Sequence, residues 1–202
     1  MEKKTHIACA NLISLTLFRP TSIADLLITI GTSSLGGVLP DVDLKDSTSD
    51  KLFDRLMTSL ITIIIMGIII NYYFNINLYN VIKGYNNIYN YILCISIFIT
   101  MSYLGSKTSH RSFTHSLLGA FIYSSIISYS FNDQIVLIFF ISYLSHIILD
   151  LLNKKGIELL YPLKIRMSLN LCEVKGTVNK ILFITTSILN IVVLILISLK
   201  NY

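Results

Sequence analysis

Residues 109–116 read Ser-His-Arg-Ser-Phe-Thr-His-Ser, and the rest of the chain is best interpreted outward from this stretch. It places two of the four histidines, and an arginine, directly before a long apolar run. Two further polar stretches match it: Leu-Pro-Asp-Val-Asp at 39–43 and His-Ile-Ile-Leu-Asp at 146–150. These three clusters stand out because the remainder is dominated by Ile, Leu, Tyr, Ser and Asn.

The composition indicates a membrane protein. Hydrophobic residues make up 53% of the 202 residues and charged ones only 13%, with a mean hydropathy of +0.70, whereas soluble domains carry about 25% charged residues. A chain this apolar needs lipid to cover it, so we expect an all-α polytopic helical bundle forming a single membrane-embedded domain over residues 1–202. The net charge of +5 could suit nucleic acid, but the basic residues cluster in particular loops. We therefore expect no direct nucleic-acid binding.

Five apolar segments of 18 or 19 residues are each long enough to cross a hydrocarbon core of about 30 Å: 56–74, 88–105, 113–131, 135–152 and 181–199. Before them, residues 5–39 predict an N-terminal helical hairpin, because Arg19-Pro20 breaks the apolar pattern and Thr21 or Ser22 can cap a second helix. A single kinked span is the alternative.

Lysine and arginine orient these spans. Loops 40–55, 106–112 and 153–180 are rich in basic residues, whereas loop 75–87 has one and loop 132–134 has none. This alternation follows the positive-inside rule, which assigns the basic-rich loops to the cytoplasm. All three polar clusters then fall on the cytoplasmic face of a multi-pass protein.

The spacing within the clusters suggests ligands. His146 and Asp150 are four residues apart and share one face of a helix, although a hydrogen-bonded pair at a helix end would look the same. His110 and His115 would diverge by about 140° if both were helical, so we expect a cap at Ser109 or Ser112 to leave His110 in a loop.

The two carboxylates at 41 and 43 flank one residue, so an extended turn would point both the same way. Paired carboxylates suit a hard or borderline cation, but they are also common in turns. Arg111 offers a planar fork for phosphate or carboxylate, or else a cationic anchor at the membrane face. His6, at the start of the first helix, is the fourth histidine of the chain. The possible ligands are more than one tetrahedral ion needs, so two or more metals are credible: His6, Asp41, Asp43, His110, His115, His146 and Asp150.

Four stretches, at 36–43, 110–116, 143–150 and 156–163, resemble the YdjM-like family. Its members are bacterial inner-membrane proteins described as metal-dependent hydrolases, distantly similar to zinc-dependent phospholipase C and the fungal single-strand nucleases. The resemblance covers most of residues 5–165, and residues 166–202 add a loop and a last span. It implies that the seven residues above occupy the family's metal-ligand positions. Our hypothesis for the metal is zinc first and manganese second. The well-understood enzymes of the wider group are soluble and secreted, whereas this chain is expected in the bacterial cytoplasmic membrane.

These observations lead to one functional hypothesis and two rivals. We expect a hydrolase of a lipid or lipid-linked phosphoester, in which Asp43 or Asp150 accepts a proton and Arg111 holds a phosphate oxygen. The first rival is a non-enzymatic, metal-stabilised membrane protein that recruits a cytoplasmic partner through loop 153–180. The second is a transporter with His146 and Asp150 on an ion path, which the absence of charge deeper in the spans disfavours.

Overall fold

The computed structural model describes residues 1–44, 88–173 and 176–201, together with 58, 62 and 66. In the described part of the chain every regular element is a helix, and the only β-type pairs are two isolated bridges. The elements, in chain order, are α1 (Lys3–Phe18), α2 (Ile23–Val38), η1 (Leu39–Asp43), α5 (Ile88–Ser106), η2 (Phe113–His115), α6 (Leu117–Ser128), α7 (Asp133–Leu151) and α8 (Thr177–Asn201).

The N-terminal helical hairpin is confirmed. α1 ends at Arg19, whose φ of 43° turns the chain back, and Ser22 caps α2 by accepting a hydrogen bond from the Asp25 amide at 3.1 Å. α2 and η1 together form a segment, Ile23–Asp43, that is long and apolar enough to cross a membrane. The prediction from the sequence was a hairpin packed against the bundle or re-entrant, without a span of its own.

Two more helices meet the length and hydropathy of a span: Asp133–Leu151, which is α7, and Thr177–Leu199, which is most of α8. They correspond to the expected spans 135–152 and 181–199. α5 coincides with the expected segment 88–105, within which Asn90–Ser106 is an apolar helix shorter than the three candidate spans. Of the expected span 56–74 the structure describes only residues 58, 62 and 66, so five spans are not confirmed.

The prediction of one continuous helix over 113–131 was wrong. The chain forms the short helix η2, then an extended residue, Ser116, with ψ near 160°, and then α6, which has 12 residues. At 1.5 Å per residue α6 is about 18 Å long, too short to span. The break arises because the Ser116 hydroxyl accepts a hydrogen bond from the Gly119 amide at 3.0 Å and caps α6. This cap leaves the three preceding residues free to turn toward the centre of the protein.

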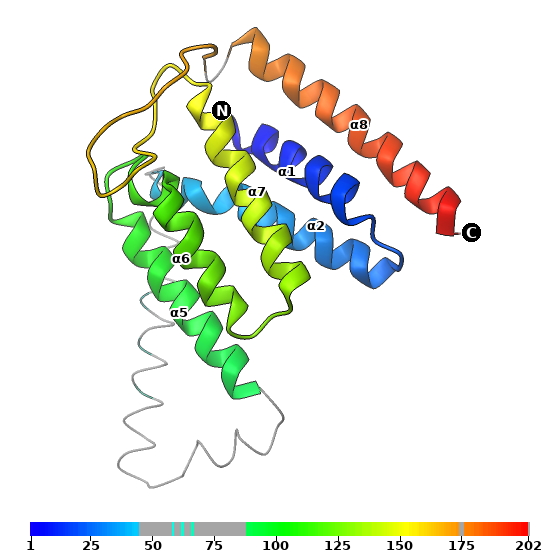
Figure 1. The fold of residues 1–202 in the computed structure, drawn as a ribbon, viewed down its shortest axis with the longest axis horizontal. Helices are drawn as coiled ribbons and strands as arrows, with labels where there is room; N and C mark the ends of the chain where they lie inside the picture. The colour runs from blue at the N-terminus through cyan, green and yellow to red at the C-terminus, as the bar shows by residue number, and fades with distance from the viewer. Residues whose placement is uncertain (45–57, 59–61, 63–65, 67–87, 174–175, 202) are drawn as a thin grey trace, which may run out of the picture.

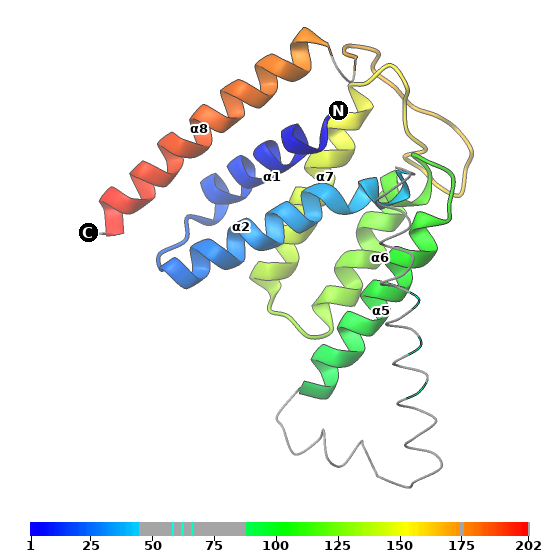
Figure 2. The same ribbon diagram turned by 180° about the vertical axis from the view of Figure 1, so that it is seen from behind.

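α1, α2 and α7 pack against one another, with α8 beside α1 and the α5–α6 pair beside α7 (Figures 1 and 2). Glycines allow the closest approaches, since a Cβ on Gly36 would lie 2.6 Å from the Phe139 carbonyl oxygen of α7. Small residues at helix contacts are typical of membrane bundles. Phe139, Tyr143 and Tyr123 form the centre of an apolar core between α5, α6 and α7.

The polar clusters meet at one end of this bundle. The N-terminus, η1, η2 and the C-terminal end of α7 lie together there, beside the long connection from α7 to α8 (Figure 1). At this end the fold brings together residues 149 positions apart in the chain, Met1 and Asp150.

Candidate metal centre

Four segments contribute the predicted site residues. α1 provides His6 in its first turns, and η1 provides Asp41 and Asp43. His110 lies in the turn before η2 and His115 in η2 itself, and α7 provides His146 and Asp150. The three histidines at 6, 115 and 146 are fully buried, and the carboxylates at 41, 43 and 150 are at most 7% exposed. His110 differs, since 40% of its side chain is exposed. The site is thus a buried cluster that reaches the surface beside His110.

His115 and His146 face each other at the centre of this cluster, with their Nε2 atoms 3.3 Å apart. An oxygen of Asp41 lies 3.7 Å from the first Nε2 and 3.8 Å from the second. Asp150 Oδ2 lies 3.5 Å and 4.0 Å from the same two atoms. Two nitrogens and two oxygens therefore converge from three elements.

The separation of the two nitrogens fits a shared ion. Two imidazole nitrogens bound tetrahedrally at about 2.05 Å from zinc lie roughly 3.3 Å apart. The ring of His146 is also held as a ligand requires: its Nδ1 donates to the Gly37 carbonyl at 2.8 Å, which leaves the lone pair on Nε2. A histidine oriented by a backbone carbonyl on its other nitrogen is the usual arrangement at metal sites.

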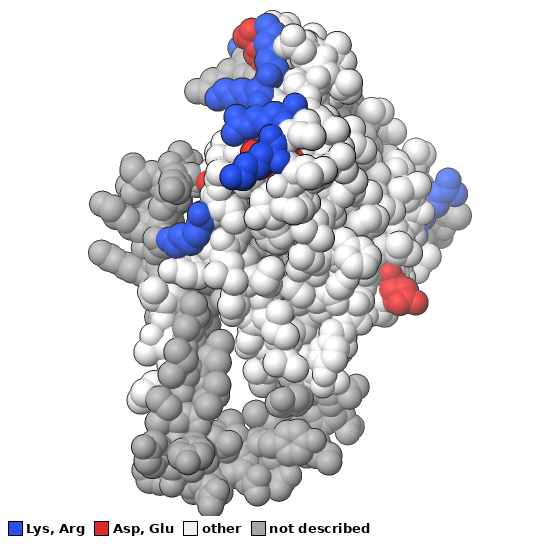
Figure 3. Space-filling model, turned by 60° about the vertical axis from the view of Figure 1, so that its left-hand side comes forward, with Lys and Arg blue, Asp and Glu red and all other residues white. Residues whose placement is uncertain are grey.

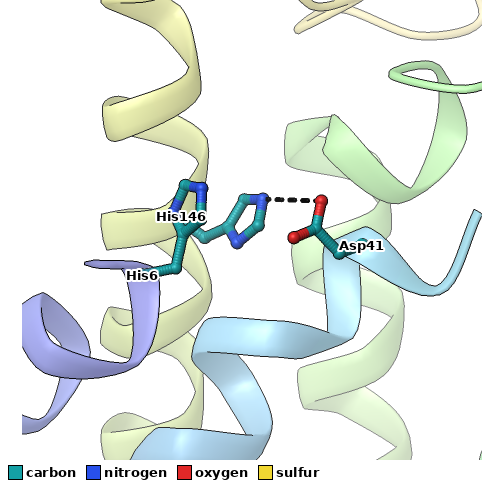
Figure 4. Close-up of side chains that lie close together, drawn as sticks. All are labelled: His6, Asp41 and His146. Carbon is teal, nitrogen blue, oxygen red and sulfur yellow. Dashed lines mark ion pairs between the residues drawn. The ribbon is translucent and has the colours of Figure 1, made fainter. Parts of the chain in front are cut away.

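His6 extends the cluster on the side of α1. Its ring stacks on that of His146 at 3.7 Å and 16° (Figure 4). Neither ring nitrogen of His6 has a hydrogen-bond partner among the described residues, although Nε2 lies 3.4 Å from Asp150 Oδ1, and Asp41 Oδ2 has none either. Buried polar atoms without partners are costly, and a cation would bind Asp41 Oδ2 and one of the two His6 nitrogens. Ligand atoms of His6, Asp41 and His146 lie within 4.8 Å of one another, as do those of His115, His146 and Asp150. The donor set therefore fits one metal ion or two.

The expectation that Asp41 and Asp43 point the same way was wrong. They lie in a 3₁₀ helix, in which residues two apart differ by about 240°. Asp41 faces the Nε2 side of His115, while Asp43 Oδ2 lies 3.3 Å from its Nδ1. The two carboxylates thus hold the same imidazole from opposite sides.

Asp43 also organises the turn before η2. Its Oδ1 pairs with His110 Nδ1 at 2.8 Å, and its Oδ2 accepts from the Arg111 amide at 2.9 Å and from the Thr114 hydroxyl at 2.8 Å. These bonds support Arg111 in a left-handed conformation, with φ at 68°, which is uncommon for a residue with a long side chain. Asp43 is therefore the residue that shapes the His110–His115 segment.

Arg111 is only 6% exposed and points inward. Its Nη2 lies 3.1 Å from Asp150 Oδ2, and its Nη1 donates to the Gly156 carbonyl at 3.3 Å. Asp150 Oδ1 accepts from the Met1 amino group at 2.5 Å. The side chain of Arg111 thus fixes Asp150 in place, and its Nε has no hydrogen-bond partner among the described residues.

Charge in the cluster shifts the protonation of His115. Burial by itself lowers the pKa of this imidazole, but the carboxylates of Asp150, Asp41 and Asp43 outweigh burial and raise the pKa to about 10. The metal-free site is therefore expected to hold a proton on His115 at neutral pH. A metal ion would have to displace that proton to bind there.

The structure brings all seven predicted ligands into one region, but in different roles. Five of them surround the centre: His6, Asp41, His115, His146 and Asp150. The other two, His110 and Asp43, form a hydrogen-bonded pair at its edge. Two further contacts, from the Gly37 carbonyl and the Met1 amino group, were not predicted from the sequence. Neither carries a side-chain pattern, so no spacing rule could have found them.

The fold and the site together define a helical membrane protein with a buried histidine–aspartate cluster that could bind a metal. A comparison with protein families agrees: the family model "YdjM inner membrane protein" matches residues 1–201. The chain belongs to this family. No curated protein and no solved structure gives a match to the chain.

Proposed function

We propose that the chain is a metal-dependent hydrolase of the inner membrane that cleaves a phosphoester of a lipid or a lipid-linked group at the cytoplasmic face. One observation carries this proposal: four separate segments converge on a buried set of histidine nitrogens and carboxylate oxygens, several of which lack partners in the described structure. A fold held only by packing would not retain such costly groups. The cytoplasmic orientation is supported by the basic-rich loops at this end.

A divalent ion at such a site, zinc or manganese, lowers the pKa of water and polarises a phosphoryl oxygen. The ligands for it are the convergent atoms of His115, His146, Asp41 and Asp150, with His6 available for a second ion. Both carboxylates first considered as proton acceptors have both oxygens occupied. Asp43 accepts strong hydrogen bonds on its two oxygens, so its role is to position the turn before η2. Asp150 accepts from the Met1 amino group and pairs with Arg111, so its role in this scheme is that of a metal ligand.

Arg111 has two roles in this scheme. It holds Asp150 through Nη2 at 3.1 Å, which keeps that carboxylate ionised and oriented. In this scheme a phosphate oxygen accepts from the Arg111 Nε–H, which is buried and has no hydrogen-bond partner among the described residues. Because the side chain sits between Asp150 and the loop after α7, a phosphate held there would lie beside the cluster.

The test is turnover by the purified protein in lipid vesicles. We would load the protein with zinc or manganese, incubate it with a panel of phospholipids and lipid-linked phosphates, and analyse the products by mass spectrometry. His115→Ala should abolish cleavage while expression is maintained. Ser109→Ala, an exposed change in the same turn, should leave it intact. Equal turnover in wild type and His115→Ala would refute the proposal.

A second candidate is a membrane protein that uses metal for structure and acts by recruiting a partner. Its support is the burial of the cluster, because only His110 among the ligand candidates is substantially exposed, whereas catalytic metal sites keep a position open to substrate. Stoichiometric, tightly held metal without turnover on any phosphoester would favour this candidate over the hydrolase.

A further inference from the structure

The connection from α7 to α8 exposes an unusual number of aliphatic side chains. Five large ones within 12 residues are 42–68% exposed: Leu160, Leu163, Ile165, Leu169 and Leu171. Single exposed aliphatic residues are normal on any protein, but a contiguous group marks an interaction surface. We call residues 160–171 the apolar connection.

The apolar connection has a defined backbone. Ile157 and Met167 exchange two hydrogen bonds, at 2.9 and 2.8 Å. The Leu169 amide donates to the Leu151 carbonyl at 2.8 Å, and the Leu171 amide donates to the Leu152 carbonyl at 2.9 Å. The exposed aliphatic side chains are therefore presented by a folded segment that is fastened to the end of α7.

Basic side chains alternate with the aliphatic ones. Lys164 stands between Leu163 and Ile165, and Arg166 follows directly. Both are exposed, and Arg166 Nε lies 3.8 Å from Glu158 Oε1. Figure 3 shows Lys and Arg gathered at one end of the molecular face in view. A surface that is both aliphatic and cationic complements the edge of an anionic lipid leaflet.

The position of the apolar connection in the fold also supports an anionic lipid leaflet as its partner. It joins α7 to α8, and both helices are long and apolar enough to cross a membrane. The connection between two such helices begins and ends at the water–lipid boundary, and its hydrogen bonds to Leu151 and Leu152 keep it beside the end of α7. There the aliphatic side chains can enter the lipid while Lys and Arg extend to the phosphates.

We propose that the apolar connection lies in the headgroup layer of the membrane that α7 and α8 cross, and binds anionic phospholipid. Leu163, Ile165, Leu169 and Leu171 insert among the lipid chains, and Lys164 and Arg166 contact lipid phosphates. An acidic protein partner is disfavoured because it would leave the aliphatic side chains uncovered. This proposal does not rest on the hydrolase activity, and it holds whether or not the metal centre is catalytic.

The residues just before the apolar connection contact the metal centre. The Gly156 carbonyl accepts from Arg111 Nη1, and the Glu158 amide donates to the Arg111 carbonyl at 2.9 Å. A lipid phosphate bound by Lys164 or Arg166 would therefore lie on the same loop whose first residues contact Arg111.

The experiment uses the absence of tryptophan from the whole chain. Leu163→Trp and Leu169→Trp each create a single reporter in the full-length protein, reconstituted in phosphatidylcholine vesicles with or without phosphatidylglycerol. We expect blue-shifted emission, quenching by lipids spin-labelled near the headgroup, and weak quenching by aqueous iodide. Leu189→Trp on α8 is the control for a lipid-facing position, and free N-acetyltryptophanamide is the reference for water.

The second measurement tests the basic residues. With Leu163→Trp as reporter, quenching by spin-labelled phosphatidylglycerol relative to spin-labelled phosphatidylcholine gives a relative association constant. Lys164→Gln with Arg166→Gln should lower it by up to roughly 25-fold, about fivefold per charge. Emission like that of free indole, with no lipid quenching, would overturn the proposal. The apolar connection would then be a candidate surface for binding a protein partner. Quenching without preference for phosphatidylglycerol would overturn the role of the two basic residues.

Discussion

Gly36→Ala tests how the helix packing supports the metal centre. A Cβ at this position would lie 2.6 Å from the Phe139 carbonyl oxygen, about 0.8 Å inside ordinary van der Waals contact. The clash is with backbone, so α2 and α7 have to separate. The next residue, Gly37, holds His146 through a 2.8 Å hydrogen bond, and this bond would lengthen. Overpacking of this kind costs about 1–3 kcal/mol, of which alanine recovers at most ~1 kcal/mol through its helix propensity.

We therefore expect a net loss of roughly 1–2 kcal/mol and, at about 2–4 °C per kcal/mol for a chain of this size, a Tm lower by roughly 2–8 °C. Gly31→Ala is the matched control on the same helix, because a Cβ there meets nothing within 4 Å. It should leave Tm unchanged or raise it. The three cysteines are free and buried, so a thiol-reactive dye can follow unfolding in detergent. If both variants melted alike, the close approach of α2 and α7 would not matter for stability, and the packing argument would be refuted.

Two further predictions concern the cluster itself. Thr114→Val removes a hydroxyl that donates to Asp43 Oδ2 at 2.8 Å and should cost about 1–3 kcal/mol, measured by the same thermal assay; an unchanged Tm would show that this bond does not support η2. Since His115 has a pKa raised to about 10, its stabilising effect on the metal-free protein is complete below its ordinary pKa near 6.5 and is lost as pH rises through about 10. Metal binding near pH 7.5 should therefore release about one proton, and metal affinity should rise up to about tenfold per pH unit below 10. Titration calorimetry in two buffers of different ionisation enthalpy measures this release, and an affinity independent of pH would contradict it.

Much of the site could be predicted from the sequence because helical spacing is a strong constraint. The four-residue interval places His146 and Asp150 on one face of α7 whatever surrounds it. The break after Arg19-Pro20 likewise predicted the hairpin of α1 and α2. These features depend on local geometry alone.

The remaining features depend on contacts that a pattern does not encode. The run after residue 112 is apolar enough to resemble a span, and only the cap by Ser116 shows that it is two short helices. Arg111 adopts a positive φ because Asp43 and the loop after α7 hold its backbone. The divergence of Asp41 and Asp43 follows from a 3₁₀ turn that the sequence alone did not distinguish from an extended one.

The most direct test of the metal centre is elemental analysis of the detergent-purified protein. Wild type would be compared with His115→Ala and His146→Ala, with Ser109→Ala as the control outside the cluster. We expect at least one zinc or manganese ion per chain in wild type and control, and its loss in both histidine variants. Wild-type protein without metal, even after reconstitution with zinc and manganese, would contradict the account and leave the buried histidines with a structural role.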